Sequence, residues 1–212
     1  MPGLKPGKLP EIDPPGGDAA LDALLADVRA CAICADSLPL GPRPVVRMAK
    51  AARILVIGQA PGTKVHETGL PWNDASGDRL RDWLGLPVDD FYDPAKLAIM
   101  PMGFCYPGRM ARGGDLPPRP ECAPAWHDAL LGHLPDIGLT LLIGQYAQSY
   151  YLGKRRAKTM TQTVHQFADY LSEGILPMPH PSWRNTAWMK KNPWFEADLL
   201  PVLRAKVQAL LG

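Results

Sequence analysis

Two stretches of the sequence combine residue types that could bind and act on a planar ring. The first, GQAPG at residues 58–62, follows an apolar run, and its glycines let backbone N–H groups approach a ligand closely. It has neither the Gly-Lys-Ser/Thr of a phosphate-binding loop nor the three spaced glycines of a dinucleotide site. Trp72, Asn73 and Asp74 follow. Trp72 could stack on a flat heterocycle while Asn73 bonds its edge; the alternative is a tight turn with Trp72 in the core.

The second stretch, residues 177–196, pairs a histidine with alternating rings and cations. His180 lies between two prolines, which hold it on a rigid, extended backbone. Cations for phosphates and rings for bases are typical of nucleic-acid binding. The alternative is the start of an amphipathic helix with solvated lysines. The alternating residues are Trp183, Arg184, Trp188, Lys190, Lys191 and Trp194.

Strand and helix patterns alternate along the chain. β-branched or apolar runs predict strands at 53–58, 96–104, 139–144 and 174–182. Helical spacing predicts helices at 19–35, 77–86, 120–134, 145–153 and 192–212. This order predicts an α/β fold of three layers, α/β/α, with a central, mainly parallel four-stranded sheet. We expect one domain over residues 19–212 after a flexible N-terminal arm, residues 1–18.

Ligands of parallel sheets bind outside the carboxyl ends of the strands. That rule brings four segments together: residues 59–74, 105–114, 145 onward, and 180–188. Both chemically suggestive stretches belong to this set. The topology therefore predicts one site that contains Trp72 and His180.

Composition sets wide limits. The 212 residues carry a net charge of +2, which by itself says nothing about nucleic acid. No segment is typical of a signal peptide or of a membrane span, so we expect a soluble, cytoplasmic protein. Its four cysteines should be reduced thiols or ligands rather than disulfides. His127 and His133, on one predicted helix, are expected at the surface.

The two stretches together resemble the uracil-DNA glycosylase superfamily. Its members have a Gly-Gln/Glu-x-Pro-Gly/Tyr motif after the first strand and His-Pro-Ser after the last, as in GQAPG (58–62) and HPS (180–182) here. The resemblance spans roughly residues 28–203 and is closest to the iron–sulfur branch of bacteria and archaea. It implies a glycosylase-like fold, a bacterial protein, and DNA containing uracil or another deaminated base as the partner.

The resemblance also implies roles for individual residues. His180 matches the histidine that bonds uracil O2 and stabilises the leaving anion, and Trp72 takes the place of the aromatic ring that stacks on the flipped base. We place Asp74 and Gln59 beside His180 in the catalytic set. The expected base-binding residues are Gly58, Ala60, Pro61, Gly62, Trp72 and Asn73.

Two positions depart from the family pattern. Ala60 stands where the most active branch has an aspartate that orients water, so Asp74, with Asn73 second, becomes the candidate for that role. Pro101 lies near where relatives place an asparagine that reads the uracil edge. Proline has no side-chain amide, so hypoxanthine or xanthine is an alternative base.

A further set of residues is expected to contact the DNA backbone. Ser182 matches a residue that grips phosphate. Residues 153–159, GKRRAKT, resemble the Lys-Arg-Arg-Ile-His insert of a branch that crosslinks itself to DNA, but Ala157 and Lys158 replace Ile-His, so no crosslinking is predicted. The predicted DNA-binding residues are Ser182, Trp183, Arg184, Asn185, Lys190, Lys191, Lys154, Arg155 and Arg156.

The cysteines match the order found in the iron–sulfur branch. Cys31 and Cys34 form a C-x2-C pair, while Cys105 and Cys122 follow the second strand and begin the next helix. By themselves these spacings are only suggestive of a metal site. The resemblance implies a structural [4Fe–4S] cluster. Zinc and four buried thiols are the alternatives, and no nucleotide cofactor is expected.

These observations favour a monofunctional DNA glycosylase that hydrolyses the N-glycosidic bond of a flipped base and leaves an abasic site. One alternative is a non-catalytic binder of damaged DNA on the same fold. Another is a nucleoside hydrolase, although a free nucleoside needs no basic, Trp-rich track. A monomer is favoured.

Overall fold

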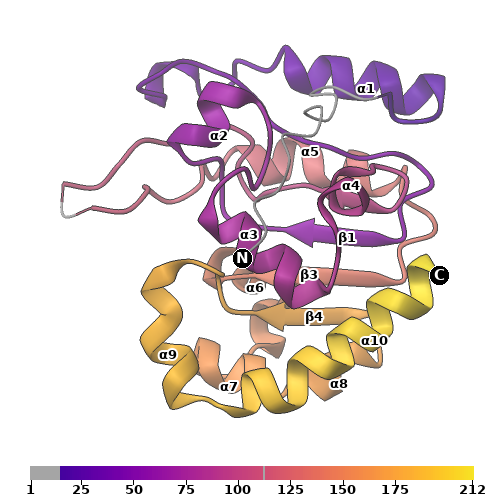
Figure 1. Cartoon of the computed structure of the whole chain (residues 1–212). Coiled ribbons are helices and arrows are strands. Elements are labelled where there is room, and N and C mark those ends of the chain that lie inside the picture. Colours follow the sequence, from indigo (N-terminus) through magenta and orange to yellow (C-terminus); the bar gives the residue numbers. More distant parts are fainter. Residues whose placement is uncertain (1–14, 112) are drawn as a thin grey trace.

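The computed structural model describes residues 15–111 and 113–212, with a four-stranded sheet at its centre (Figure 1). Every strand pair is parallel: Ile54 lies beside both Leu97 and Leu139, and Thr140 beside Ile175. The predicted parallel sheet is therefore confirmed. The strands, in spatial order, are β2 (Leu97–Ile99), β1 (Ile54–Ile57), β3 (Leu139–Ile143) and β4 (Ile175–Met178).

Helices cover both faces of this sheet, which explains why β1 is apolar at every position. Ile54 and Val56 join a core shared with α3 and α10, whereas Leu55 and Ile57 join a core shared with α1, α5 and α6. In Figure 1, α3 and α10 lie in front of the sheet and α5 and α6 behind it. The three-layer α/β/α architecture is confirmed.

The α-helices in the described part of the chain are α1 (Ala19–Arg29), α2 (Thr63–Thr68), α3 (Ala75–Leu84), α4 (Val88–Tyr92), α5 (Cys122–Leu131), α6 (Gln145–Leu152), α7 (Met160–His165), α8 (Phe167–Leu171), α9 (Thr186–Lys191) and α10 (Leu200–Leu211). Short 3₁₀ turns occur at Ala35–Ser37, Gly153–Arg155 and Trp183–Asn185. Within the described ranges, no helix has the length and apolar character needed to cross a bilayer.

The strand order places a crevice at one edge of the sheet. From β1 the chain crosses to β2 on one side, while β3 and β4 lie on the other. Loops that leave β1 and β3 therefore diverge at their carboxyl ends, where open parallel sheets bind ligands. Figure 1 shows the long loop after β2 extending on the side to which the strands point.

Several elements differ from their predicted bounds. Helices α2, α4, α7, α8 and α9 have only five or six residues, too few to show a helical hydrophobic period. The predicted C-terminal helix is divided into a π-helical segment, Phe195–Leu199, and α10. Pro201, at the start of α10, has no N–H to donate to the preceding turn, which is consistent with that irregularity.

Residues 15–18, the last part of the predicted N-terminal arm, form hydrogen bonds with the domain. Residues 1–14 lie outside the described residues, but residues 15–18 pack against the domain. The carbonyl of Gly16 accepts a hydrogen bond of 2.7 Å from the Lys50 N–H, and Asp18 caps α1 by accepting one of 2.7 Å from the Leu21 N–H.

His127 is buried, which corrects the prediction that it lies at the surface. It projects from α5 into the core, where Nδ1 lies 2.6 Å from the Tyr151 hydroxyl and Nε2 lies 3.2 Å from the Pro101 carbonyl oxygen. Because that carbonyl can only accept, Nε2 carries the proton. Its ring also stacks on Phe104, with centroids 5.5 Å apart. His127 thus supports the backbone just after β2.

Burial lowers the pKa of His127 from 6.5 to about 4. The unfolded chain therefore binds a proton at this residue between pH 6.5 and pH 4, while the folded chain does not. The stabilisation is present above pH 6.5 and is lost as the pH falls towards 4, with an upper limit of about 3 kcal/mol.

We predict that His127→Gln flattens this part of the pH profile of unfolding free energy, measured by denaturant titration. His133→Gln, which alters a partly exposed histidine just beyond α5, should leave the profile unchanged. Parallel profiles for the wild type and His127→Gln would contradict the prediction.

Candidate active site

A cleft of about 740 Å³ opens at the carboxyl ends of the strands. All four segments that were predicted to converge contribute to its wall. Its size suits a planar ligand with part of a polymer attached. The predicted site residues that line it are Gly58, Gln59, Ala60, Pro61, Gly62, Trp72, Asp74, His180, Ser182, Trp183, Arg184 and Asn185.

Trp72 and His180 are neighbours within this cleft. Their ring centroids lie 5.4 Å apart and the ring planes are inclined by 34°. Gly58 makes room for the indole, because a Cβ at this position would lie 2.9 Å from Trp72 Cζ2. Trp72 is also the only non-glycine residue with a positive φ, 56°, in the part of the chain that the structure describes. Such backbone strain is common at ligand sites.

The backbone carbonyl of His180 is hydrogen-bonded, whereas its ring nitrogens form no hydrogen bond with another described residue. Its carbonyl accepts a hydrogen bond of 2.7 Å from the Asn185 side-chain amide. Burial lowers the pKa of the imidazole below its usual value of 6.5, although the Asp74 carboxylate acts in the opposite direction. The ring is therefore neutral at pH 7, with one N–H available as a donor.

The other two predicted catalytic side chains are engaged in local contacts. Asp74 caps α3, because its carboxylate accepts a hydrogen bond of 2.9 Å from the Gly77 N–H. The Gln59 side-chain amide donates to the Leu116 carbonyl over 3.1 Å. Gln59 therefore joins the loop after β1 to the loop after β2.

Several predicted residues lie outside the cleft. Asn73 is partly exposed but does not line it. Lys190 and Lys191 are exposed on α9, and Lys154 on the 3₁₀ turn after α6. The neighbouring cations have local partners: Arg155 forms an ion pair with Glu173, and Arg156 donates to the Ser149 hydroxyl over 2.6 Å.

The cleft also contains residues that sequence reasoning did not single out. They include Arg109, Met110 and Asp115 from the loop after β2, and Gln145 and Tyr146 from the start of α6. That loop has no hydrophobic period, so only its place in the topology indicated that it would reach the site. Burial raises the pKa of Asp115, while Arg109 and Arg184 act to lower it.

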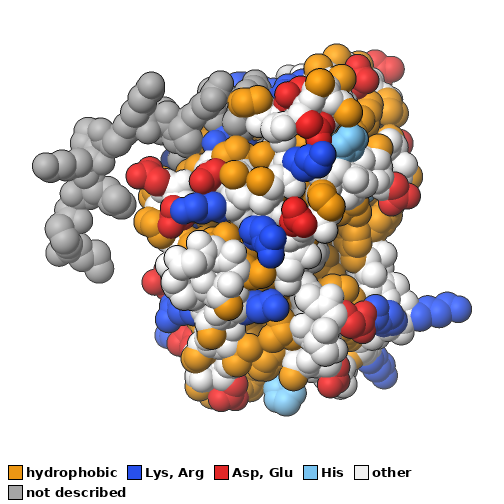
Figure 2. Space-filling model, turned by 90° about the vertical axis from the view of Figure 1, so that its right-hand side faces the viewer, with side chains coloured by type: hydrophobic (Ala, Val, Ile, Leu, Met, Phe, Trp, Pro, Cys, Tyr) orange, Lys and Arg blue, Asp and Glu red, His pale blue; other side chains and the backbone are white. Residues whose placement is uncertain are grey.

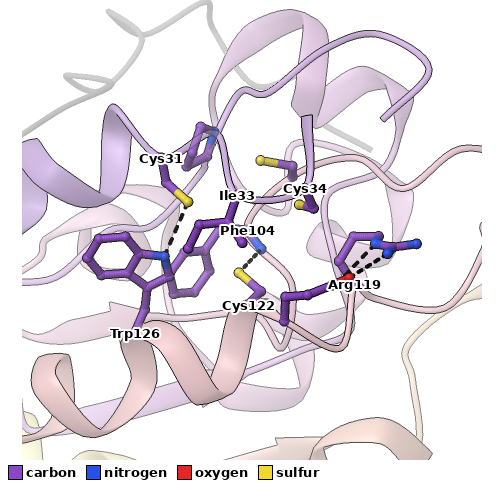
Figure 3. Close-up of a pocket in the computed structure, with 10 residues that line it drawn as sticks. Cys31, Ile33, Cys34, Phe104, Arg119, Cys122 and Trp126 are labelled. Atoms are coloured by element: carbon purple, nitrogen blue, oxygen red, sulfur yellow. Dashed lines mark hydrogen bonds and ion pairs between the residues drawn. The ribbon is translucent and has the colours of Figure 1, made fainter. Parts of the chain in front are cut away.

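The four cysteines line one small cavity, between the end of α1 and the start of α5. Figure 3 shows Cys31, Cys34 and Cys122 around the same space. Trp126 donates its indole N–H to Cys31 Sγ, and the Phe104 N–H donates to Cys122 Sγ, each over 3.3 Å. All four are free thiols.

Burial raises the pKa of Cys105 to about 11 and that of Cys122 to about 12. Nearby thiols contribute to both shifts, so Cys105 and Cys122 would be protonated without a cation. Among the described residues, no three Cys, His, Asp or Glu side chains are grouped so that they could hold one metal ion.

Charges of both signs are mixed on the face shown in Figure 2. Figure 2 shows the side of the molecule opposite the long loop after β2, where Lys and Arg side chains are interspersed with Asp and Glu. At the cleft, by contrast, Arg184 lies beside Trp183, whose side chain is 75% exposed, with the guanidinium 5.6 Å from the ring centroid. The cleft rim thus presents a cation beside an exposed aromatic ring.

Residues 46–204 match the family model described as the uracil DNA glycosylase superfamily. The chain belongs to this superfamily. The match covers most of the chain, including all four strands and all the cleft-lining residues except Val45. It begins after Cys31 and Cys34, so it does not extend to the cysteine arrangement of the iron–sulfur branch.

Membership of the uracil DNA glycosylase superfamily supports a DNA-glycosylase-type role, with DNA as the partner. It also confirms the resemblance on which the predicted site was built.

Gly77 fixes the position of the Trp72 backbone. A Cβ at residue 77 would lie 1.7 Å from the Trp72 carbonyl oxygen, so any side chain must displace that segment. We predict that Gly77→Ala lowers the free energy of unfolding by about 1–3 kcal/mol, as overpacking does, measured by denaturant titration. Gly132→Ala is the matched control, because its Cβ would meet nothing closer than 3.4 Å. Equal stability of the two variants would contradict this.

Proposed function

We propose that this protein is a monofunctional DNA glycosylase that releases uracil, or a related deaminated base, flipped out of DNA. It would hydrolyse the N-glycosidic bond and leave an abasic site. The observation that carries the proposal is the placement of the Trp72 ring and the neutral His180 imidazole in one cleft, with centroids 5.4 Å apart.

The chemistry suits those two groups. When the glycosidic bond of deoxyuridine breaks, the sugar becomes an oxocarbenium-like cation and the base leaves with negative charge on N1 and O2. A neutral imidazole N–H directed at O2 stabilises that charge as it develops. The backbone N–H groups of Gln59, Ala60 and Gly62, which also line the cleft, would supply further donors. Because His180 is desolvated, each such bond is stronger than it would be in water.

The same cleft offers compensation for extruding the base. Removing a base from the stack costs a few kcal/mol, and stacking on an aromatic ring returns about 1–3 kcal/mol. Trp72 would provide that stack. Trp183, exposed at the rim, is placed to contact the duplex, and Arg184 beside it is placed to contact phosphate.

The edge of the base is read by fewer side chains than the family pattern would provide. Pro101 lines the cleft, and its carbonyl is already bonded to His127. Pro101 has no side-chain amide, so it cannot bond the edge of uracil as an asparagine at this position would. This supports testing hypoxanthine and xanthine beside uracil.

The absence of an amine nucleophile favours simple hydrolysis. Within the described ranges, the side chains that line the cleft include two arginines, Arg109 and Arg184, but no lysine. A bifunctional glycosylase that cleaves the strand through a Schiff base requires an amine close to the sugar.

The decisive assay uses single- and double-stranded oligonucleotides that contain uracil, hypoxanthine or xanthine, followed by alkali to cleave abasic sites. We predict alkali-dependent strand breaks with at least one base. His180→Ala should lower the single-turnover rate by about 10²–10³-fold, as the loss of one oxyanion donor does. His165→Ala, which removes an exposed histidine outside the cleft, is the control.

Other outcomes would point elsewhere. Tight, salt-sensitive binding without base release would indicate a non-catalytic binder of damaged DNA. Turnover of free deoxyuridine without turnover of DNA would indicate a nucleoside hydrolase. Breaks that appear without alkali would contradict the monofunctional assignment.

We further propose that Cys31, Cys34, Cys105 and Cys122 hold a [4Fe–4S] cluster, as in the iron–sulfur branch. The fit rests on the donor set, because four thiols line one cavity and four thiolates suit such a cluster. When bound, the cluster would supply a crosslink between the end of α1 and the ends of the loop after β2.

This proposal predicts that protein purified without oxygen is brown and contains iron and acid-labile sulfide in equal amounts. Cys105→Ser should lose both and lower the unfolding free energy, since it removes a crosslink. Ser37→Ala, an exposed change in the same region, should keep them. A colourless protein that contains zinc, or neither metal, would overturn the proposal.

A further inference from the structure

The Asp115 carboxylate lies in the cleft without an assigned function. It comes from the loop between Cys105 and Cys122, far in sequence from the stretches that suggested the site. Its Oδ2 is 3.5 Å from the point where a Cβ on Gly62 would be, so it stands beside the backbone of the GQAPG loop. A half-buried carboxylate at this position faces the space that a bound base and sugar would occupy.

The surroundings of Asp115 combine partial burial with balanced charges. Burial raises its pKa, Arg109 and Arg184 lower it, and the Asp74 carboxylate raises it. In residues 15–111 and 113–212, no group forms a hydrogen bond or an ion pair with the Asp115 carboxylate. Its oxygens are therefore available to a ligand or to water.

Asp74, the carboxylate that the sequence suggested for this role, is placed differently. It is exposed, and it caps α3 through the Gly77 N–H. That contact stabilises the helix and engages one of the two carboxylate oxygens. Of the two carboxylates, Asp115 is the less solvated and the less engaged.

The position of Asp115 is fixed by its neighbours. Residues Arg109 and Asp115 form an antiparallel bridge, and the Leu116 N–H donates to the Gly108 carbonyl over 2.8 Å. On the other side, the Gln59 amide donates to the Leu116 carbonyl over 3.1 Å. Gln59 thus ties the residue next to Asp115 to the end of β1.

We propose that Asp115 is the catalytic residue that orients and deprotonates the attacking water, and that Gln59 positions it. This inference rests on the proposed glycosylase function. As the glycosidic bond breaks, its electron pair leaves with the base. The water oxygen forms a new bond to the sugar C1′ and its proton passes to the Asp115 carboxylate. The carboxylate then returns the proton to the released base through solvent. The negative carboxylate also stabilises the sugar cation.

The test measures the single-turnover release of the nucleobase that the wild type removes. It uses the full-length protein with any metal that the protein retains on purification. Asp115→Asn keeps the shape of the side chain but removes the carboxylate that would accept the proton of water. The rate of nucleobase release should therefore fall by about 10²-fold or more. Binding to a duplex with an abasic-site analogue should be unchanged. Asp198→Asn, an exposed carboxylate outside the cleft, is the matched control and should keep the wild-type rate.

The role of Gln59 is tested by a double-mutant cycle. If Gln59 acts only by placing Asp115, then Gln59→Ala lowers the rate in the wild type but has no further effect in Asp115→Asn. A merely structural role for Gln59 would lower the rate and the unfolding free energy in both backgrounds. Unfolding midpoints of all variants separate lost folding from lost catalysis.

Each result has a distinct meaning. If the wild type releases no base from any oligonucleotide, the proposed function fails and this inference fails with it. If the wild type is active and Asp115→Asn keeps its rate, only the inference fails. A large loss in Asp74→Asn without one in Asp115→Asn would assign the water to Asp74. Equal losses of rate and DNA binding in Asp115→Asn would make Asp115 a binding residue.

Discussion

The parallel pairing of β1 with both β2 and β3 is the constraint on which the rest of this structure depends. Because all four strands point the same way, the loops that follow them emerge at one edge. Because β1 is central and the chain departs from it to either side, those loops separate and leave a cleft. Trp72 and His180 meet there even though more than a hundred residues of chain lie between them.

Structural and chemical roles overlap closely in this cleft. Gly58 and Gly77 are small because Trp72 packs against one and its carbonyl against the other. Asp74 begins a helix, and Gln59 joins two loops. His127, deep in the core, bonds the Pro101 carbonyl at the cleft wall. The geometry of the cleft therefore depends on side chains that do not line it as well as on those that do, as in preorganised sites generally.

The cysteine cavity and the cleft are connected through one loop. Cys105 and Cys122 stand at its two ends, and Arg109, Met110 and Asp115 are presented to the cleft between them. Fixing both ends of a loop reduces the conformational freedom that its middle must lose on binding DNA. A structural cluster would in this way contribute to the site without taking part in the chemistry.

Local patterns were sufficient for the strands, the longer helices, and the superfamily, because β1 is a continuous apolar run and the GQAPG and HPS motifs are contiguous in sequence. They failed for helices of five or six residues, which are shorter than the window in which a period is visible. They also failed for His127, whose burial depends on Tyr151 and the Pro101 carbonyl, groups from two other elements. The sequence by itself determined which side chains can stack on a base and donate to it. Only the tertiary structure decided that Asp115 joins them and that Asn73 does not, because the cleft wall is set by packing between elements distant along the chain.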